Sequence, residues 1–168
     1  MKTRSSYLVE AMTVFSKILV PIDGSEHSDR ALETALQIAK KFDSRIALLH
    51  VYSVAVTPVV IPEPTTLNPT GVPIATSAEV SKMVDAARDA GKRILEDGEQ
   101  KVRAESVEVE TYLREGNSAQ EIVKAAKEGQ FDLIVIGARG IHRIRDLLMG
   151  SVTEGVVKHA SCPVLVVK

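Results

Sequence analysis

Residues 131–151 read FDLIVIGARGIHRIRDLLMGS, an apolar run followed by a loop that carries glycines and basic residues. The unbroken apolar run at 131–137 is typical of a strand that is buried on both faces, as the strands of parallel sheets are. Gly137 permits a sharp turn at the end of this strand, and Ser151 is a residue type that opens helices. A buried strand that leads through a loop to a helix is the repeating unit of an α/β fold.

The segments on either side continue this alternation of strands and helices. Apart from the run at 131–137, strands are expected at 17–23, 45–53, 106–113 and 163–168. Helices are expected to begin at Ser25 or Ser28, near Ala78, at a capping box that starts at Ser118, and at Ser151. The order predicts an α/β fold with helices on both faces of a five-stranded parallel sheet. The segment 106–113 alternates apolar and polar residues, which places it nearer the edge of the sheet.

Two segments and one helix depart from a regular α/β pattern. Residues 53–75 contain five prolines, which exclude a helix or a central strand, so a long irregular loop is expected there. Residues 1–14 form an N-terminal extension ahead of a single domain at 15–168. In the long helix expected at about 78–103, Gly91 and Gly98 lower the helix propensity and predict bending or fraying.

Composition narrows the class of protein and its partners. The chain has 168 residues, of which 45% are hydrophobic and 26% charged, as in globular domains. The formal net charge of −1 gives no basic field for nucleic acid, and no apolar run approaches the roughly 20 residues that cross a bilayer. The single cysteine, Cys162, is compatible with a reducing compartment, so a cytoplasmic protein is expected. We interpret Cys162 as a small buried hydrophobic residue and not as a reactive thiol.

The loops that follow the first and fourth strands are the expected ligand site, because ligands of parallel sheets bind beyond the carboxyl ends of the strands. After the fourth strand, the helix start at Gly150, Ser151, Val152 and Thr153 offers backbone N–H groups and hydroxyls to a phosphate, and Gly140 allows close approach. Cationic side chains surround this loop: Arg139, His142, Arg143 and Arg145. An alternative reading makes Ser151 an ordinary N-cap, Gly140 an ordinary turn and the arginines a solvated loop.

Asp23, at the end of the first strand, is the second candidate. Its carboxylate can meet a ribose hydroxyl or a magnesium ion bound to a nucleotide, since Mg²⁺ prefers oxygen ligands. Alternatively, Asp23 and Gly24 form a turn with a side-chain cap.

Other chemistry finds little support in the sequence. The pattern G-x-x-x-x-G-K-[ST] of Walker-type nucleotide hydrolases is absent, and no G-x-G-x-x-G follows the first strand. His27, His50 and His159 lack the spacing of zinc ligands. No serine or cysteine has the surroundings of an activated nucleophile, so we expect that the protein is not an enzyme.

Several segments together resemble the universal stress protein family, and more narrowly its ATP-binding branch. They are KILVPIDGSEHSDRAL (17–32), LLHVY (48–52), FDLIVIGARG (131–140), the pattern G-x2-G-x9-G-S that starts at Gly137, and GSVTEGVVKHASCPVLVVK (150–168). The resemblance implies a three-layer αβα sandwich with strand order 3-2-1-4-5, like that of adenine nucleotide α-hydrolases.

The resemblance also implies a binding site for ATP with Mg²⁺ or Mn²⁺ at its phosphates. Adenine and ribose would lie against Pro21, Ile22, Asp23, Val51, Ile136 and Gly137. The phosphates would lie against Gly140, Gly150, Ser151, Val152 and Thr153, with Arg139 at a variable position of the motif.

Three functions remain open at this point. The first is an ATP-binding module that regulates a protein partner, the second is a slow ATP hydrolase or an adenylyl-transfer relative, and the third is a nucleotide-free dimeric stress protein. Because family members are commonly dimers, the apolar last strand, Val164–Val167, is expected to pair with its copy in a homodimer. In the alternative, the arm at residues 1–14 covers this edge and keeps the chain monomeric.

Overall fold

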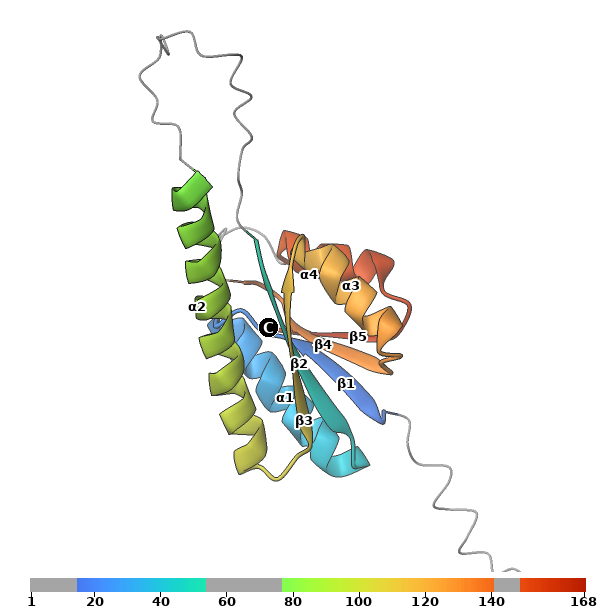
Figure 1. Ribbon diagram of the computed structural model, residues 1–168. Helices are drawn as coiled ribbons and strands as arrows, with labels where there is room; N and C mark the ends of the chain where they lie inside the picture. The colour runs from blue at the N-terminus through green and yellow to red at the C-terminus, as the bar shows by residue number, and fades with distance from the viewer. Residues whose placement is uncertain (1–14, 54–76, 141–148) are drawn as a thin grey trace, which may run out of the picture.

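The computed structural model describes residues 15–53, 77–140 and 149–168, which form one α/β unit (Figure 1). In chain order its elements are β1 (Lys17–Pro21), α1 (Glu26–Phe42), β2 (Arg45–Tyr52), α2 (Ser77–Ala104), β3 (Val109–Glu115), α3 (Ser118–Glu128), β4 (Leu133–Gly137), α4 (Ser151–His159) and β5 (Val164–Val167). The predicted N-terminal extension, nearly all of the proline-rich loop and the basic residues His142, Arg143 and Arg145 lie outside the described residues.

The sheet is parallel, and its strand order is β3-β2-β1-β4-β5, as the family resemblance implies. Helices α1 and α2 cover one face, and α3 and α4 cover the other (Figure 1). The three-layer prediction is therefore confirmed, and so is the edge position of β3. Strand order reverses between β1 and β4, so the loops after these strands diverge and leave a crevice at their carboxyl ends.

The sheet carries a separate hydrophobic core on each face, because side chains of a strand alternate between faces. Ile18 and Leu48 belong to the core beneath α1 and α2, whereas Leu19 and Leu49 belong to the core beneath α3 and α4. All four side chains are at most 1% exposed. The strands are thus buried on both faces, as their unbroken apolar sequences predict.

Asp132 ties β1 to β4 at the end of the sheet opposite the crevice. Its carboxylate accepts hydrogen bonds from the hydroxyl and the backbone N–H of Ser16, at 2.7 and 2.9 Å, and from the backbone N–H of Lys17 at 2.8 Å. Partial burial acts to raise the pKa of this carboxyl, but the three hydrogen bonds outweigh it, so the pKa lies below its ordinary value.

Three predicted boundaries need correction. The N-cap of α3 is Asn117, whose side chain accepts from the N–H of Gln120 at 3.1 Å, so the capping box at Ser118 is wrong by one residue. Strand β3 begins at Val109 and not at 106, because Ser106 takes a left-handed φ of 59° in the turn after α2. The N-cap of α4 is Gly150, which excludes the reading of Ser151 as that cap.

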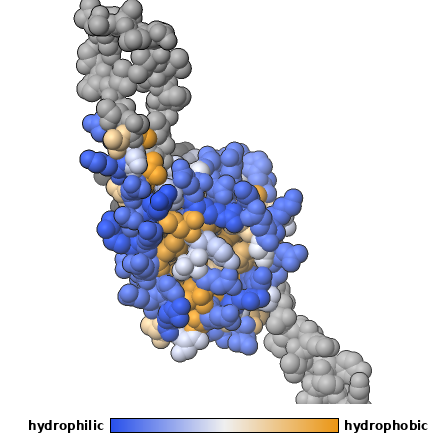
Figure 2. Space-filling model, in the orientation of Figure 1, coloured by the Kyte–Doolittle hydropathy of each residue, from blue (hydrophilic) through white to orange (hydrophobic). Residues whose placement is uncertain are grey.

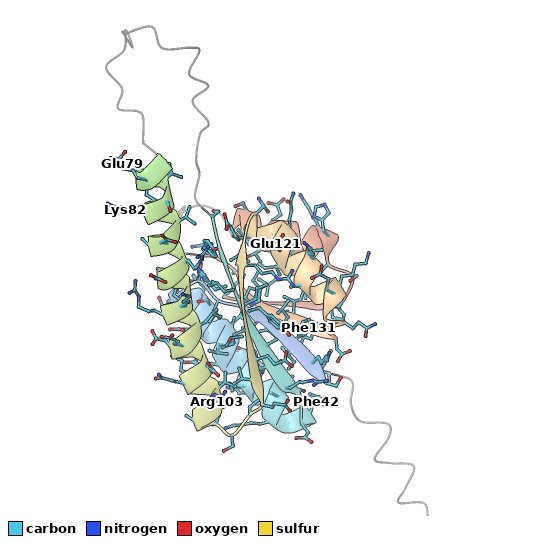
Figure 3. The ribbon with its side chains drawn as sticks, viewed as in Figure 1. Phe42, Glu79, Lys82, Arg103, Glu121 and Phe131 are labelled. Carbon is cyan, nitrogen blue, oxygen red and sulfur yellow. The ribbon has the colours of Figure 1, made fainter. Side chains whose placement is uncertain are left out.

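Helix α2 runs unbroken through both of its glycines, so the expected fraying is wrong. A Cβ atom at Gly91 would lie 2.6 Å from Cδ2 of His50, and one at Gly98 would lie 2.8 Å from Cδ1 of Ile22. These glycines therefore let α2 approach the sheet closely. The first turns of α2, which carry Glu79 and Lys82, extend past the ends of the strands (Figure 3). None of the described helices is both long and apolar enough to cross a membrane.

Candidate functional site

A cavity of about 530 Å³ lies at the carboxyl ends of β1, β2 and β4, where strand order reverses. This volume is within the range of small-molecule sites. The cavity is lined by every site residue predicted from the sequence: Pro21, Ile22, Asp23, Val51, Ile136, Gly137, Arg139, Gly140, Gly150, Ser151, Val152 and Thr153. The structure thus brings together three segments that lie far apart in the sequence.

The tip of α4 forms one side of this cavity and is open to a ligand. The first hydrogen bond within the helix runs from the N–H of Glu154 to the carbonyl of Gly150 at 2.9 Å. The N–H groups of residues 151–153 therefore precede the intrahelical ladder, and Gly150 makes no side-chain cap. By contrast, Ser25 caps α1 and Asn117 caps α3. An uncapped helix tip with its partial positive charge suits a phosphate.

Packing against the described residues does not require a glycine at position 150. A Cβ atom there would lie 3.6 Å from the carbonyl oxygen of Ala138 and from Cα of Arg139, an ordinary contact distance. Its φ of −77° and ψ of 156° are open to any residue. The N–H of Gly150 donates to the Ala138 carbonyl at 2.8 Å, which holds the helix tip beside the end of β4. With no side chain, Gly150 supplies no acceptor of its own to the N–H groups of the tip.

Gly140 and Asp23 approach each other closely across the cavity floor. A Cβ atom at Gly140 would lie 2.5 Å from Oδ2 of Asp23, so only glycine fits there without a shift. The other carboxylate oxygen, Oδ1, accepts from the N–H of Ser25 at 3.0 Å. Asp23 therefore does cap the turn after β1, and it also lines the cavity.

Thr153 departs from its expected role. Its hydroxyl donates to the carbonyl of Gly137 at 2.8 Å, and the residue is 3% exposed. The hydroxyl ties α4 to β4 and is not available to a phosphate, so Thr153 can offer only its backbone N–H. Ser151 is exposed at the tip, and its hydroxyl remains a candidate ligand contact.

The cavity has walls that the sequence analysis did not assign. Helix α2 contributes small and apolar side chains, α3 contributes two residues near its start, α1 contributes one serine in its first turn, and β2 with the residue after it contributes the rest. They are Ser28, Leu49, His50, Tyr52, Ser53, Ala87, Ala90, Ile94, Ser118 and Ile122. The helical spacing of Ala87, Ala90 and Ile94 marks one face of α2, but no motif indicates that this face passes over the strand ends. On the side of the molecule drawn in Figure 2, apolar residues gather beside α2 within a hydrophilic border.

His50 and Tyr52 of β2 make side-chain contacts at this wall. The Nδ1 atom of His50 is 2.8 Å from the carbonyl oxygen of Ile22. The hydroxyl of Tyr52 donates to Glu115 at 3.2 Å and accepts from Nε of Arg88 at 3.3 Å. Tyr52 therefore links β3 to α2 beside the cavity.

The described residues offer little for metal or thiol chemistry. Within 15–53, 77–140 and 149–168, no group of three or more His, Cys, Asp or Glu side chains is placed to hold a metal ion. Burial, aided by the negative charge of Asp132, raises the pKa of the Cys162 thiol above its ordinary value. Because the thiolate is the nucleophile, a raised pKa disfavours reactivity. Cys162 packs against the core as a small hydrophobic residue, but it is only partly buried, so the predicted full burial is wrong.

Comparisons with known proteins agree with the fold and with the family that the sequence resembles. The model of the universal stress protein family matches residues 15–168. Universal stress protein YxiE of Bacillus subtilis is 35% identical over 155 residues, which make up 92% of this chain and 100% of the relative. The solved structure of universal stress protein UspA from Lactobacillus plantarum has a TM-score of 0.75 at 26% identity and covers 92% of this chain and 98% of its own. A universal stress protein solved in complex with cAMP has a TM-score of 0.65 at 25% identity, and the match covers 93% of this chain and 99% of that protein's chain.

Proposed function

This chain belongs to the universal stress protein family, and we propose that it binds ATP in the cavity and acts as a nucleotide-dependent regulatory module. One observation carries the proposal: an uncapped helix tip, a glycine loop and a carboxylate from distant segments line one cavity with apolar walls. The cAMP bound by a family member favours an adenine nucleotide as the ligand. We place the module in the cytoplasm, since a single cysteine suits a reducing compartment.

The lining of the cavity suggests how ATP would lie. The phosphates would meet the N–H groups of residues 151–153 and the side chains of Ser151 and Arg139. The adenine would lie against apolar residues such as Val51 and Ile136. Asp23 would face the ribose or a Mg²⁺ or Mn²⁺ ion carried by the phosphates. One carboxylate suffices for that ion, because Mg²⁺ bound to a nucleotide takes its other ligands from phosphates and water.

A regulatory role is favoured over rapid hydrolysis. Phosphoryl transfer needs a positioned water and a group that stabilises charge in the transition state, besides a metal. Among the described residues, the cavity is lined by Asp23, His50 and Arg139, and no serine of the lining has the sequence surroundings of an activated nucleophile. We therefore expect turnover far below the enzyme median of about 10 s⁻¹. A rate near that median, measured on protein freed of contaminating ATPase, would favour the alternative of an ATP hydrolase.

The decisive experiment is mass analysis of the small molecules that acid denaturation releases from freshly purified protein. We expect ATP or ADP at close to one molecule per chain. If the protein releases no nucleotide and calorimetry detects no binding of added ATP, the nucleotide-free alternative is correct.

We further propose a homodimer through β5, the edge strand beside β4. The carbonyls of Pro163 and Val167 accept hydrogen bonds from β4, so the backbone groups of Val164 and Val166 point toward the free edge. Leu165 of β5 is 38% exposed, which leaves apolar surface on the edge strand itself. Antiparallel pairing of two copies about a two-fold axis would satisfy both edges.

Val166→Pro tests the dimer, because it removes an N–H donor that points away from β4 and leaves the pairing with β4 intact. We expect monomer or aggregate by light scattering, whereas the matched variant Val166→Ala should stay dimeric. A monomeric wild-type protein at micromolar concentration would contradict the dimer and favour the alternative in which residues 1–14 cover the edge.

A further inference from the structure

His50 presents a hydrogen-bond acceptor of defined identity at the cavity wall. Its Nδ1 atom is 2.8 Å from the carbonyl oxygen of Ile22, and a carbonyl oxygen can only accept. The ring proton therefore lies on Nδ1. In the neutral ring, the other nitrogen, Nε2, is then an acceptor without a proton.

The Nε2 atom of His50 is accessible at the protein surface. Among the described residues, Nδ1 of His27 is the sole buried side-chain nitrogen or oxygen without a hydrogen-bond partner, so Nε2 of His50 is not a buried atom. Within the described part of the chain, its ring makes one hydrogen bond, through Nδ1. His50 is one of the residues that line the cavity, and its ring packs beside Gly91, between the cavity-lining residues Ala90 and Ile94 of α2.

The neighbouring helix leaves room for this edge of the ring. A Cβ atom at Gly91 of α2 would lie 2.6 Å from Cδ2 and 3.2 Å from Nε2 of His50. Any larger residue at position 91 would push the ring out of place. The imidazole is thus held between the β1 end, through Ile22, and the backbone of α2.

We propose that His50 determines nucleotide specificity by accepting, at Nε2, a hydrogen bond from a donor group of the bound nucleotide. This inference rests on the proposed nucleotide function. An adenine nucleotide carries two kinds of donor, the ribose hydroxyls and the exocyclic amino group of the base. In a base with a keto group in place of the amino group, the keto oxygen would face Nε2. Both atoms are acceptors, so no hydrogen bond could form, which is unfavourable.

The two hydrogen bonds of His50 can be separated by substitution. In His50→Asn, the side-chain amide nitrogen can take the place of Nδ1 and keep the bond to Ile22, but the acceptor at Nε2 is lost. In His50→Gln, the longer side chain can return an amide oxygen near Nε2, but it gives up the donor at Nδ1. Comparing the two variants therefore separates two roles of His50: contact with the ligand through Nε2, and support of the end of β1 beside Asp23 through Nδ1.

The experiment measures affinities by calorimetry for ATP and three analogues, each lacking one donor: 2′-deoxy-ATP, 3′-deoxy-ATP and purine riboside triphosphate. We expect the wild-type protein to bind one analogue about tenfold more weakly than ATP, which identifies the donor. His50→Asn should bind ATP about tenfold more weakly and should no longer distinguish ATP from that analogue. His50→Gln should keep the discrimination.

The proposal is overturned if the wild-type protein binds all three analogues as tightly as ATP, or if His50→Asn weakens ATP and every analogue by the same factor. A wild-type protein that binds no adenine nucleotide refutes the proposed function itself, before any variant is compared. Should His50→Asn fail to fold, ¹⁵N NMR of the wild-type imidazole decides. ATP, but not the weak analogue, should shift the Nε2 resonance, and no shift with ATP overturns the proposal.

Discussion

Replacing Gly150 by asparagine should stabilise the fold and weaken ATP binding at the same time. Gly150 is the N-cap of α4, and its backbone angles are those of side-chain-capped helices. A Cβ atom fits there at 3.6 Å from its nearest neighbours in the described part of the chain, so we expect the variant to fold. The asparagine oxygen would then accept from the N–H of Val152 or Thr153, which is one of the donors that the proposal assigns to the phosphates.

The structure sets the expected magnitudes. At an N-cap, asparagine exceeds glycine by a few tenths of a kcal/mol, which corresponds to a rise of about 1 °C in Tm for a chain of this size. A hydrogen bond to a charged group contributes about 1.5–3 kcal/mol, so loss of one phosphate contact should weaken ATP binding by about 10- to 150-fold. Adenosine, which has no phosphate, should bind Gly150→Asn as it binds the wild-type protein.

The assay is calorimetry with ATP and adenosine, combined with thermal unfolding. Gly150→Ala is the matched control for bulk, because it adds Cβ without an acceptor and should cost less ATP affinity than asparagine. Asn117→Gly calibrates the stability of an asparagine cap in this fold, since the Asn117 side chain accepts from Gln120 N–H at 3.1 Å. If Gly150→Asn gains stability and still binds ATP with wild-type affinity, the α4 tip is not the phosphate site.

Three further substitutions test other parts of the structure. Ser151→Ala should weaken ATP binding by about 1.5–3 kcal/mol and leave Tm unchanged, because Ser151 is not the N-cap of α4. Calorimetry and thermal unfolding test this, and a lower Tm with unchanged ATP affinity would contradict it. Gly140→Val should abolish ATP binding in a folded protein, since its Cβ would meet Asp23 at 2.5 Å, and retained affinity would refute the assignment. Asp132→Asn should lower the free energy of unfolding by about 1–2 kcal/mol near neutral pH. The pKa of Asp132 in the folded protein lies below the unfolded value of about 3.9. The stabilisation by Asp132 is therefore complete above about pH 3.9 and is lost as the pH falls through the folded pKa. Denaturant titrations of both proteins should show this loss, and a difference in stability that persists at lower pH would contradict it.

The strands and the cavity floor could be predicted from the sequence because their signals are local. The apolar runs of β1 and β4 end at polar or glycine residues, and parallel strands bring those ends to one edge of a sheet. The wall formed by α2 could not be predicted, since it depends on how far the helix extends past the strands. The hydroxyl of Thr153 was misassigned because its partner, the Gly137 carbonyl, lies 16 residues away in the sequence.

Gly91 is a second position at which the sequence alone leads to the wrong expectation, because tertiary packing changes the effect of the residue. Sequence reasoning counts a glycine within a helix as a cost, and the cost is real for an isolated helix. In the fold, the glycine allows close contact between α2 and the ring of His50, which tertiary packing favours. Local propensity and packing therefore conflict at this position, and packing determines the outcome.

The uncapped tip of α4 also connects ligand binding to the edge of the sheet. A helix of 9 residues is marginal on its own, and α4 lacks a side-chain cap, so its stability depends on contacts such as the Thr153–Gly137 hydrogen bond. A phosphate at the tip would supply the missing cap, and a ligand that binds only the folded state adds stability in proportion to its occupancy. Helix α4 is followed in the chain by β5, the edge strand at which we expect the second copy to pair. A phosphate that orders the tip would therefore also order the surface at which we expect the second copy to pair, so nucleotide occupancy and dimer stability should rise together.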